Sequence, residues 1–460
     1  MSSLSITSEI GPLRKILLHR PGEEIRRMTP GMRQQLLFDD ILYLDLARRE
    51  HEAFSRLMTI VAPPDGVLEV ADLLVDILAD ELVRRRLIDD VCVLEGSSED
   101  VRYLLLDQAP ADLALRLLAG WEKPVASGSL AGALDTYPYT LPPIPNMMFM
   151  RDPAVVIGEG IVLAQMARPA RRREPLLMRY IFTQHPLFAA GGAEPPLWFD
   201  RLQSEQIRSL RSTGGRDPFT VEGGDILVVR PDLLLVGASE RTSNEGIDML
   251  ARELRRRGSP VRTIYAVIMP KQRSTMHLDT IFTFLSHDEC LVYPPLILPG
   301  GGEQVGIVRL SRDARGALRA EPEHRSLVAC LQAELGRPIH AIPCGGTSRL
   351  YQDREQWTDG ANAFALRPGL ILGYERNEQT FQALWAAGYQ LLVQEDLIDW
   401  LPDPAEPAGG HWFENTARIA EIRAHPERKY AIKISGLELS RARGGPRCMT
   451  MPLERAPYEM

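Results

Sequence analysis

The sequence predicts an α/β fold in which β-hairpins alternate with helices around a closed, propeller-like ring. Three observations support this prediction: a strand–turn–strand pattern occurs four times, a polar residue begins each unit, and helical periodicity fills a long stretch before the first unit. Hairpins repeated radially would surround one polar pocket with their equivalent ends. The spacing between the units is irregular, unlike that of a strict solenoid.

The four strand–turn–strand units begin at Asp152, Asp225, Asp279 and Asn362. Each consists of two short runs of β-branched and apolar residues, separated by a turn that carries Gly, Pro, Asp or Ser, which is typical of a β-hairpin. An arginine follows the second run in three of the four units. The hairpins therefore present polar groups at equivalent ends.

Helical periodicity characterises residues 71–142 instead. A proline-rich segment, TYPYTLPPIPN, closes this region and cannot continue a helix. We expect one domain over residues 1–460, with a helical-bundle insertion at 71–142. One face of its first helical segment is apolar, and we interpret it as core. That face comprises Leu73, Leu74, Ile77, Leu78 and Leu82.

Composition and charge restrict the possible partners. The chain has 460 residues, of which 45% are hydrophobic and 25% charged, as in ordinary globular proteins. Its formal net charge of -8 argues against a nucleic-acid or anionic-membrane partner, because both require a basic surface. No segment predicts a signal peptide or a membrane span.

Cysteine usage indicates a reducing compartment. The cysteines are odd in number, widely spaced and without CxxC pairs, so neither a disulfide framework nor a zinc site is indicated. We expect a cytoplasmic protein that binds no metal. The five cysteines are Cys92, Cys290, Cys330, Cys344 and Cys448.

Cys448 lies in the most unusual setting of the five. A Gly-Gly-Pro turn precedes it, and Arg441, Arg443 and Arg447 surround it in the sequence. Cationic, glycine-rich surroundings favour the nucleophilic thiolate, whereas a structural cysteine has apolar neighbours. Taken alone, a single cysteine is more often a small core residue. The segments FMRDP, EGGD and MHLDT favour the catalytic interpretation, because they supply the other groups of a cysteine enzyme.

These segments contribute a candidate histidine, His277, and three candidate carboxylates, Asp152, Glu222 and Asp279. His277 and Asp279 are two residues apart, so on a strand both side chains would project from one face. A buried histidine satisfied by the aspartate is the structural alternative. For Asp152 the alternative is a salt bridge to Arg151, and the glycines beside Glu222 are interpreted as a backbone kink next to a site rather than a phosphate loop.

A thiolate, a histidine and three carboxylates form an anionic site that suits a cationic substrate. Guanidinium is the natural candidate, because it is planar, always charged and bound bidentately by carboxylates. Arg171, Arg241 and Arg443 could then bind a carboxylate at the other end of the ligand, although each alone could equally be a solvated surface residue. Such a ligand is arginine.

The chain resembles bacterial arginine deiminase, of the guanidino-group-modifying superfamily. The resemblance extends nearly end to end and includes FDDI, PNMMFMRD, ARRRE, EGGD, SERTS, MHLDT and RGGPRCM. It implies a five-bladed α/β propeller of ββαβ modules with a helical insertion. It also implies hydrolysis of L-arginine to L-citrulline and ammonia without metal or organic cofactor. A homo-oligomer is expected.

The resemblance also implies roles for individual residues. Cys448 resembles the nucleophile that forms a covalent amidino-enzyme, and His277 resembles the general acid and base. Asp152 and Asp279 match the carboxylates that bind the guanidinium, and Glu222 matches the residue that assists them. The matches for the amino-acid part of the substrate are Asn146, Phe149, Arg171, Arg241 and Arg443. Ala442 departs from the pattern, because the family often has glycine there.

Three alternatives remain. An amidinotransferase would share the thiolate chemistry but deliver the amidino group to an amine. A hydrolase of agmatine or methylarginine is nearer, but agmatine lacks the carboxylate that the arginines would bind. A regulator that binds arginine without catalysis is the third alternative, and the complete set of catalytic residue types disfavours it.

Overall fold

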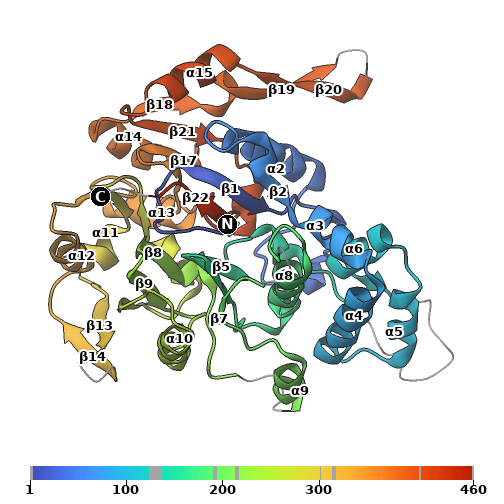
Figure 1. Ribbon diagram of the computed structural model, residues 1–460. Helices are drawn as coiled ribbons and strands as arrows, with labels where there is room; N and C mark the ends of the chain where they lie inside the picture. The colour runs from blue at the N-terminus through green and yellow to red at the C-terminus, as the bar shows by residue number, and fades with distance from the viewer. Residues whose placement is uncertain are drawn as a thin grey trace.

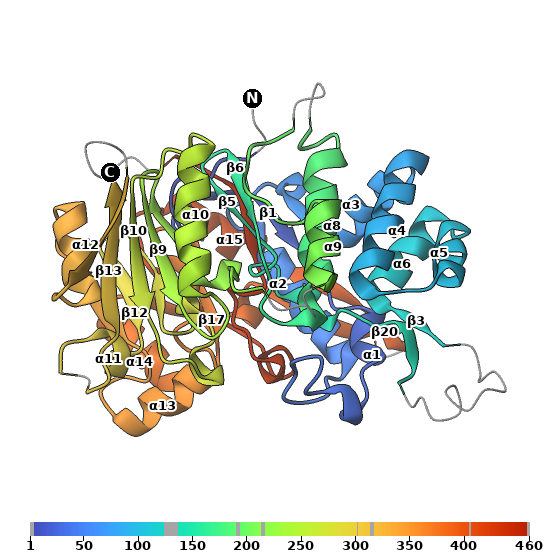
Figure 2. The same cartoon turned by 90° about the horizontal axis from the view of Figure 1, so that it is seen from below.

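The computed structural model describes residues 4–123, 137–189, 194–212, 217–300, 302–312, 317–403 and 406–457. It is a mixed α/β structure in which short sheets lie around the middle of the molecule and most helices lie outside them (Figure 1). In Figure 2 the helices of residues 70–119 form a lobe on one side of the sheets.

Five of the sheets share one plan: an antiparallel pair of strands in which one strand also pairs in parallel with a third. These sheets are β5–β6–β7 (Ala154–Ile157, Gly160–Leu163, Leu197–Phe199), β8–β9–β10 (Ile226–Arg230, Leu233–Ala238, Thr263–Ile268), β11–β12–β15 (Phe282–Phe284, Glu289–Val292, His340–Pro343), β16–β17–β21 (Phe364–Arg367, Leu370–Tyr374, Tyr430–Ile434) and β22–β1–β2 (Met451–Arg455, Leu13–Leu18, Val67–Glu69).

All four predicted hairpins are confirmed, as β5–β6, β8–β9, β11–β12 and β16–β17. The antiparallel pair of the fifth sheet, β1–β22, joins the first and last strands of the described residues and follows no hairpin pattern. The remaining strands extend two of these sheets or form small separate ones. They are β3 (Trp121–Glu122), β4 (Tyr139–Leu141), β13 (Gly306–Arg312), β14 (Leu318–Glu323), β18 (Gln390–Val393), β19 (Ile398–Asp403) and β20 (Glu406–Glu414).

Helices connect the strands and cover the sheets. They are α1 (Glu23–Arg26), α2 (Leu44–Met58), α3 (Val70–Leu78), α4 (Glu81–Glu95), α5 (Glu99–Leu106), α6 (Pro110–Ala119), α8 (Arg173–Gln184), α9 (Ser204–Ser212), α10 (Asn244–Arg256), α11 (Pro294–Ile297), α12 (Leu327–Leu335), α13 (Arg349–Trp357), α14 (Glu378–Ala386) and α15 (Thr416–Ala424). None of these helices is long and apolar enough to cross a membrane.

Helices α3 to α6 occupy residues 70–119 of the region predicted to be helical, whereas β3 and β4 form a strand pair near its end and residues 124–136 lie outside the described part. Leu82 also departs from the predicted apolar face. Helix α3 buries the predicted apolar face, but Leu82 is 65% exposed. The helix ends at Leu78, and Asp80 then begins α4 by accepting hydrogen bonds from the backbone N–H groups of Leu82 and Val83. Such an N-cap starts a new helix with a new orientation, so the periodicity does not continue to Leu82.

The helical region shares its core with the neighbouring sheet. Leu74 and Leu87 belong to the same buried cluster as Val156 of β5 and Leu177 of α8.

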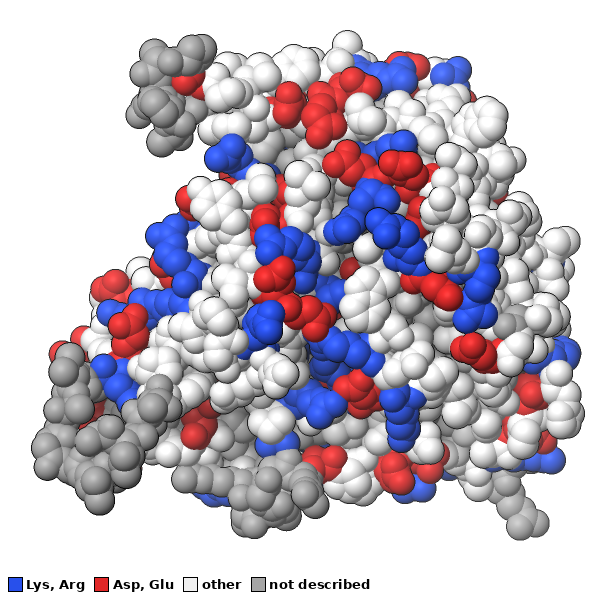
Figure 3. Space-filling view, turned by 180° about the vertical axis from the view of Figure 1, so that it is seen from behind, with Lys and Arg blue, Asp and Glu red and all other residues white. Residues whose placement is uncertain are grey.

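Acidic and basic side chains are interspersed on the face shown in Figure 3.

Candidate active site

One pocket brings together segments from all along the described chain. Eight of the ten residues predicted for the site line it. The other two, Glu222 and Asp279, are fully buried and contact His277 and Cys448, respectively. The lining residues are Leu37, Asn146, Phe149, Asp152, Arg171, Arg241, Arg273, Met276, His277, Thr280, Asp359, Ala442, Arg443, Gly444 and Cys448.

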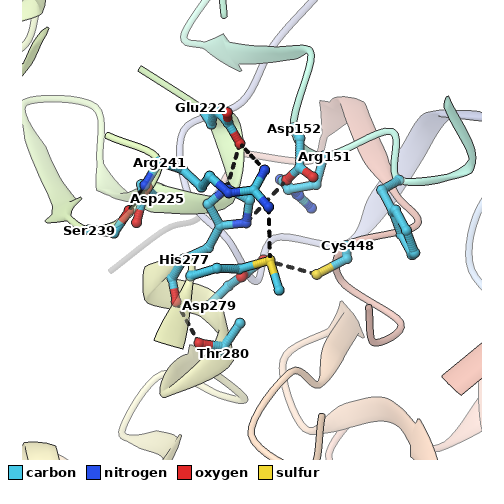
Figure 4. A network of polar contacts seen from close by, with 12 residues as sticks. Arg151, Asp152, Glu222, Asp225, Ser239, Arg241, His277, Asp279, Thr280 and Cys448 are labelled. Atoms are coloured by element: carbon cyan, nitrogen blue, oxygen red, sulfur yellow. Dashed lines mark hydrogen bonds and ion pairs between the residues drawn. The ribbon is translucent and has the colours of Figure 1, made fainter. Parts of the chain in front are cut away.

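His277 lies between two carboxylates (Figure 4). Its Nε2 is 2.9 Å from Oε2 of Glu222, and its Nδ1 is 3.6 Å from Oδ1 of Asp152. Burial alone would lower the pKa of His277, but Asp152 and Glu222 raise it from 6.5 to about 9. The imidazole is therefore protonated at neutral pH.

The prediction that His277 and Asp279 lie on a strand is wrong. His277 has extended backbone, but residues Leu278–Thr280 form a 3-10 turn and β11 begins only at Phe282. The hydroxyl of Thr280 donates to the carbonyl of His277 and helps to fix this turn. The turn directs His277 into the pocket and Asp279 toward Cys448, so the two side chains still meet one site.

Cys448 is held by contacts from two other segments. Its backbone N–H donates to Oδ1 of Asn362 at 3.1 Å, and its Sγ is 3.7 Å from Oδ2 of Asp279. Burial raises the pKa of the Cys448 thiol well above its ordinary value, and Asp279, Asp152 and Asp359 raise it further. This shift opposes the thiolate that the arginines near Cys448 in the sequence are expected to favour.

The surrounding arginines fail to stabilise a thiolate because other carboxylates engage two of them. Arg441 pairs with Asp40 and Glu438, at 2.6 Å from each. Arg447 lies 2.8 Å from Asp279 and 3.0 Å from Glu9. Arg441 and Arg447 are close to Cys448 in the sequence, but their guanidinium groups pair with carboxylates rather than with the sulfur.

Arg171 lies in the pocket wall and contacts two buried carboxylates. Its Nη1 is 2.5 Å from Oδ2 of Asp152, and its Nη2 is 2.7 Å from Oε2 of Glu174. Burial raises the pKa of Glu174 to about 7, against the opposing effect of Arg171. These contacts orient Asp152, so much of the hydrogen-bonding capacity of Arg171 is used within the protein.

The segment Glu222–Asp225 forms a kink beside the site, as predicted. A β-carbon at Gly224 would lie 2.6 Å from Nδ1 of His277, so only glycine allows this close approach. Asp225 accepts hydrogen bonds from the hydroxyl of Ser239 and the backbone N–H of Leu278, and burial raises its pKa to about 7. Asp225 thereby fixes the turn that carries His277.

Arg241 extends into the pocket toward Glu222. Its Nη1 is 3.6 Å from Oε2 of Glu222, and Nη2 is 4.0 Å from Sδ of Met276. Burial opposes ionisation of Glu222, but Arg241 and His277 lower its pKa to about 2. Figure 4 shows the Arg241 guanidinium next to the His277 ring.

The outer wall contains the remaining predicted residues. The side-chain amide of Asn146 donates to the carbonyl of Leu36, and Phe149 packs near Phe38. The guanidinium of Arg443 lies 3.6 Å above the ring of Trp357. Ala442, where the family often has glycine, ends a short 3-10 turn.

Positive φ angles at residues other than glycine occur in the described chain at three positions, Leu37, Asp359 and Arg443, and all three line this pocket. Their φ values are 66°, 61° and 65°. Side chains rarely adopt this conformation, and it concentrates at functional sites. The left-handed position of the Cys448 loop is thus Arg443, not Ala442.

Several residues that contact the predicted site residues are not themselves predicted to have a function. Asn362 and Asp225 begin predicted hairpins, as Asp152 and Asp279 do, so their position was a usable signal. Asp359 lies three residues before Asn362, as Phe149 does before Asp152. Glu174 has no signal of its own in the sequence, because its partner Arg171 is itself predicted to bind the substrate. Among the described residues, no group of three or more His, Cys, Asp or Glu side chains is arranged to hold a metal ion.

The mixed α/β fold and this carboxylate-rich pocket with a thiol and a histidine define a candidate enzyme with an anionic site. The family model "Arginine deiminase" matches residues 34–455. The arginine deiminase of Bacillus cereus (strain B4264) is 33% identical over 98% of both chains, and that of Listeria monocytogenes serotype 4a (strain HCC23) is 34% identical over 98% of both. The chain belongs to the arginine deiminase family, whose members are hydrolases acting on amidines.

Solved structures with a similar arrangement include an amidinotransferase from Microseira wollei. It is 15% identical, with a TM-score of 0.48 over 99% of this chain and 98% of that one. A dimethylarginine dimethylaminohydrolase is 14% identical, with a TM-score of 0.41 over 95% of this chain and 99% of that one.

Proposed function

We propose that the protein hydrolyses L-arginine to L-citrulline and ammonia through a covalent intermediate on Cys448. One observation carries the proposal: the Cys448 thiol and a protonated His277 share a pocket with Asp152, and buried Asp279 contacts the sulfur. Two carboxylates beside a thiol match a guanidinium group, whose nitrogens they bind while its central carbon meets the sulfur.

The substrate itself would activate the nucleophile. A guanidinium bound by Asp152 and Asp279 neutralises the carboxylates that raise the pKa of Cys448. The thiol then releases its proton to solvent, and the sulfur attacks the guanidinium carbon to form a tetrahedral adduct. His277 donates a proton to one nitrogen, the C–N bond breaks and ammonia leaves, which yields the amidino-enzyme.

Hydrolysis of the amidino-enzyme completes the reaction. The neutral His277 left by the first half takes a proton from water, and the hydroxide attacks the same carbon. The C–S bond then breaks, citrulline leaves and Cys448 is regenerated as a thiol. Glu222 keeps His277 oriented throughout, because it contacts the ring nitrogen that faces away from Asp152.

The amino-acid end of the substrate would lie in the outer part of the pocket. We assign its carboxylate to Arg241 and Arg443, with Asn146 and Phe149 contacting the rest of the molecule. We assign Arg171 mainly to holding Asp152, since Asp152 and Glu174 engage its guanidinium.

Incubation of the purified protein with L-arginine, with assays for citrulline, ammonia and ornithine, tests this function. Equal amounts of citrulline and ammonia are expected. An amidinotransferase would instead release ornithine when an amine acceptor is present, and a silent binding protein would release no product. Agmatine in place of arginine tests the substrate.

We further propose that the five sheets of common plan are blades of one α/β propeller, and that residues 71–142 are a helical-bundle insertion in one catalytic domain. The repeated strand order supports the first part. The shared core between α3, α4 and β5 supports a single domain.

A cytoplasmic location and a homo-oligomer are also proposed. All five cysteines are unpaired, which fits a reducing compartment. Exposed Leu350 and Trp385 offer apolar surface for contact between subunits. The net charge of -8 supports a small-molecule partner rather than a nucleic acid or a membrane.

A further inference from the structure

Asp359 is a buried carboxylate in the pocket wall to which the reaction steps above assign no role. Only 4% of the residue is exposed, and its Oδ2 has no hydrogen-bond partner. A buried polar atom without a partner is costly, so native proteins rarely keep one without a functional reason. Its left-handed backbone, with φ of 61°, adds a second unfavourable feature at the same residue.

Arg443 is the neighbouring buried cation; its guanidinium stacks on Trp357, but two of its nitrogens lack hydrogen-bond acceptors. Nε and Nη1 of Arg443 have no hydrogen-bond acceptor, and the residue is 8% exposed. Asp359 and Arg443 are close enough to influence each other's pKa, yet no nitrogen–oxygen distance of 4.0 Å or less joins them. A buried cation and a buried anion that lie side by side unpaired leave room for a ligand with both charges.

We propose that Asp359 binds the α-ammonium group of the substrate, while Arg443 binds the adjacent α-carboxylate. This inference rests on the proposed function, because it concerns the same pocket and substrate. An α-amino acid presents its ammonium and carboxylate on one carbon, which matches two opposite charges on one wall. The carboxylate of Asp359 thereby selects for an amine at the end of the ligand remote from the guanidinium.

Burial raises the pKa of Asp359 to about 6, while Arg443 opposes this shift. The carboxylate is therefore mainly ionised at neutral pH and available to an ammonium group. A charge-assisted hydrogen bond of this kind in a water-poor site contributes about 10- to 100-fold in affinity.

Asp359→Asn is the decisive variant, because asparagine has the same shape and also tolerates left-handed backbone. Three substrates separate the roles: L-arginine, agmatine, which lacks the carboxylate, and 5-guanidinopentanoate, which lacks the ammonium. Asp359→Asn should reduce kcat/KM about 10- to 100-fold for arginine and for agmatine, and less than about 3-fold for 5-guanidinopentanoate. Where an analogue turns over too slowly, its inhibition constant against arginine gives the same comparison.

Two further variants support the comparison. Asp359→Gly accepts the same backbone without any carboxylate and should reproduce the pattern. Asp353→Asn makes the same chemical change on the exposed face of α13 and should leave all three substrates unaffected. An equal loss for the three substrates in both Asp359 variants would overturn the inference and make Asp359 a support for the Cys448 loop. Absence of arginine turnover in the unmodified protein would contradict the proposed function instead.

Discussion

The Sγ atom of Cys448 lies 3.7 Å from Oδ2 of Asp279, and that same oxygen lies 2.8 Å from Nη1 of Arg447. A carboxylate this close to a buried thiol disfavours ionisation of the sulfur. The arrangement protects the free thiol from adventitious electrophiles, because the thiolate is the reactive form.

Replacement of the nucleophile gives the first prediction. Cys448→Ser should abolish citrulline formation, whereas Cys344→Ser should leave substantial activity. Cys344 is fully buried outside the pocket, and burial raises the pKa of its thiol to about 12. Mass spectrometry of protein quenched during turnover should place the amidino adduct on Cys448, and an adduct on Cys344 would refute the assignment.

Alkylation gives a second prediction. Iodoacetamide should modify Cys448 slowly at neutral pH, because its pKa lies well above the ordinary value, and faster as the pH rises beyond 9. A small guanidinium ligand bound to Asp152 and Asp279 without covering the sulfur should accelerate modification at neutral pH. Peptide mapping measures this rate at Cys448, with Cys344 as the internal control. Rapid alkylation of the unliganded protein at pH 7 would contradict the raised pKa.

The guanidinium contacts give a third prediction. Asp152→Asn and Asp279→Asn should each lower kcat/KM for arginine at least about 100-fold, since each removes the charge of a buried pair with the substrate. Asp279→Ala should in addition lower the free energy of unfolding by about 3–5 kcal/mol, because Arg447 keeps a buried charge without this partner. Denaturant titration measures the difference. Near-normal kcat/KM in either Asn variant would show that the aspartate does not bind the guanidinium.

Arg241 gives a fourth prediction. Arg241→Ala should lower kcat/KM about 10-fold or more for arginine and much less for agmatine, because agmatine has no carboxylate to lose a contact. The side chain also lies 3.6 Å from Glu222, so a structural role is the competing explanation. Equal loss for both substrates would favour that explanation.

The pH dependence gives a fifth prediction. Protonated His277 is required to release ammonia, so kcat/KM should fall as the pH rises through about 9. The folded-state pKa lies above the ordinary 6.5, so the charged imidazole stabilises the fold fully below pH 6.5 and this contribution is lost as the pH rises toward 9. Comparison of unfolding free energies of the unmodified protein and His277→Gln across this range measures the effect. A stability difference that grows with pH would contradict it.

Features that depend on neighbouring residues can be predicted from this sequence, whereas features that depend on contacts between distant segments cannot. The hairpins at Asp152 and Asp225 were predictable because turn residues and β-branched runs are local signals. The state of Cys448 was not, because Asp279 and Asp152 come from distant segments. Local sequence showed only the neighbouring arginines, whose partners Asp40 and Glu9 lie more than 400 residues away.

The same limit explains Leu82 and the strand expected at His277. A helix cap at Asp80 and a 3-10 turn at Leu278 each interrupt a pattern over one or two residues, which periodicity cannot resolve. The pairing of β1 with β22 could not be predicted for another reason, because no turn connects the two strands.

The pairing of β22 with β1 also sets when the enzyme can become active during its synthesis. The Cys448 loop leads directly into β22, which docks on a strand that the ribosome has made more than 400 residues earlier. The nascent chain therefore contains Asp152, His277 and Asp279 before Cys448 has reached its position in the pocket. A pocket that contains Cys448 therefore forms only after β22 has been synthesised and has docked on β1.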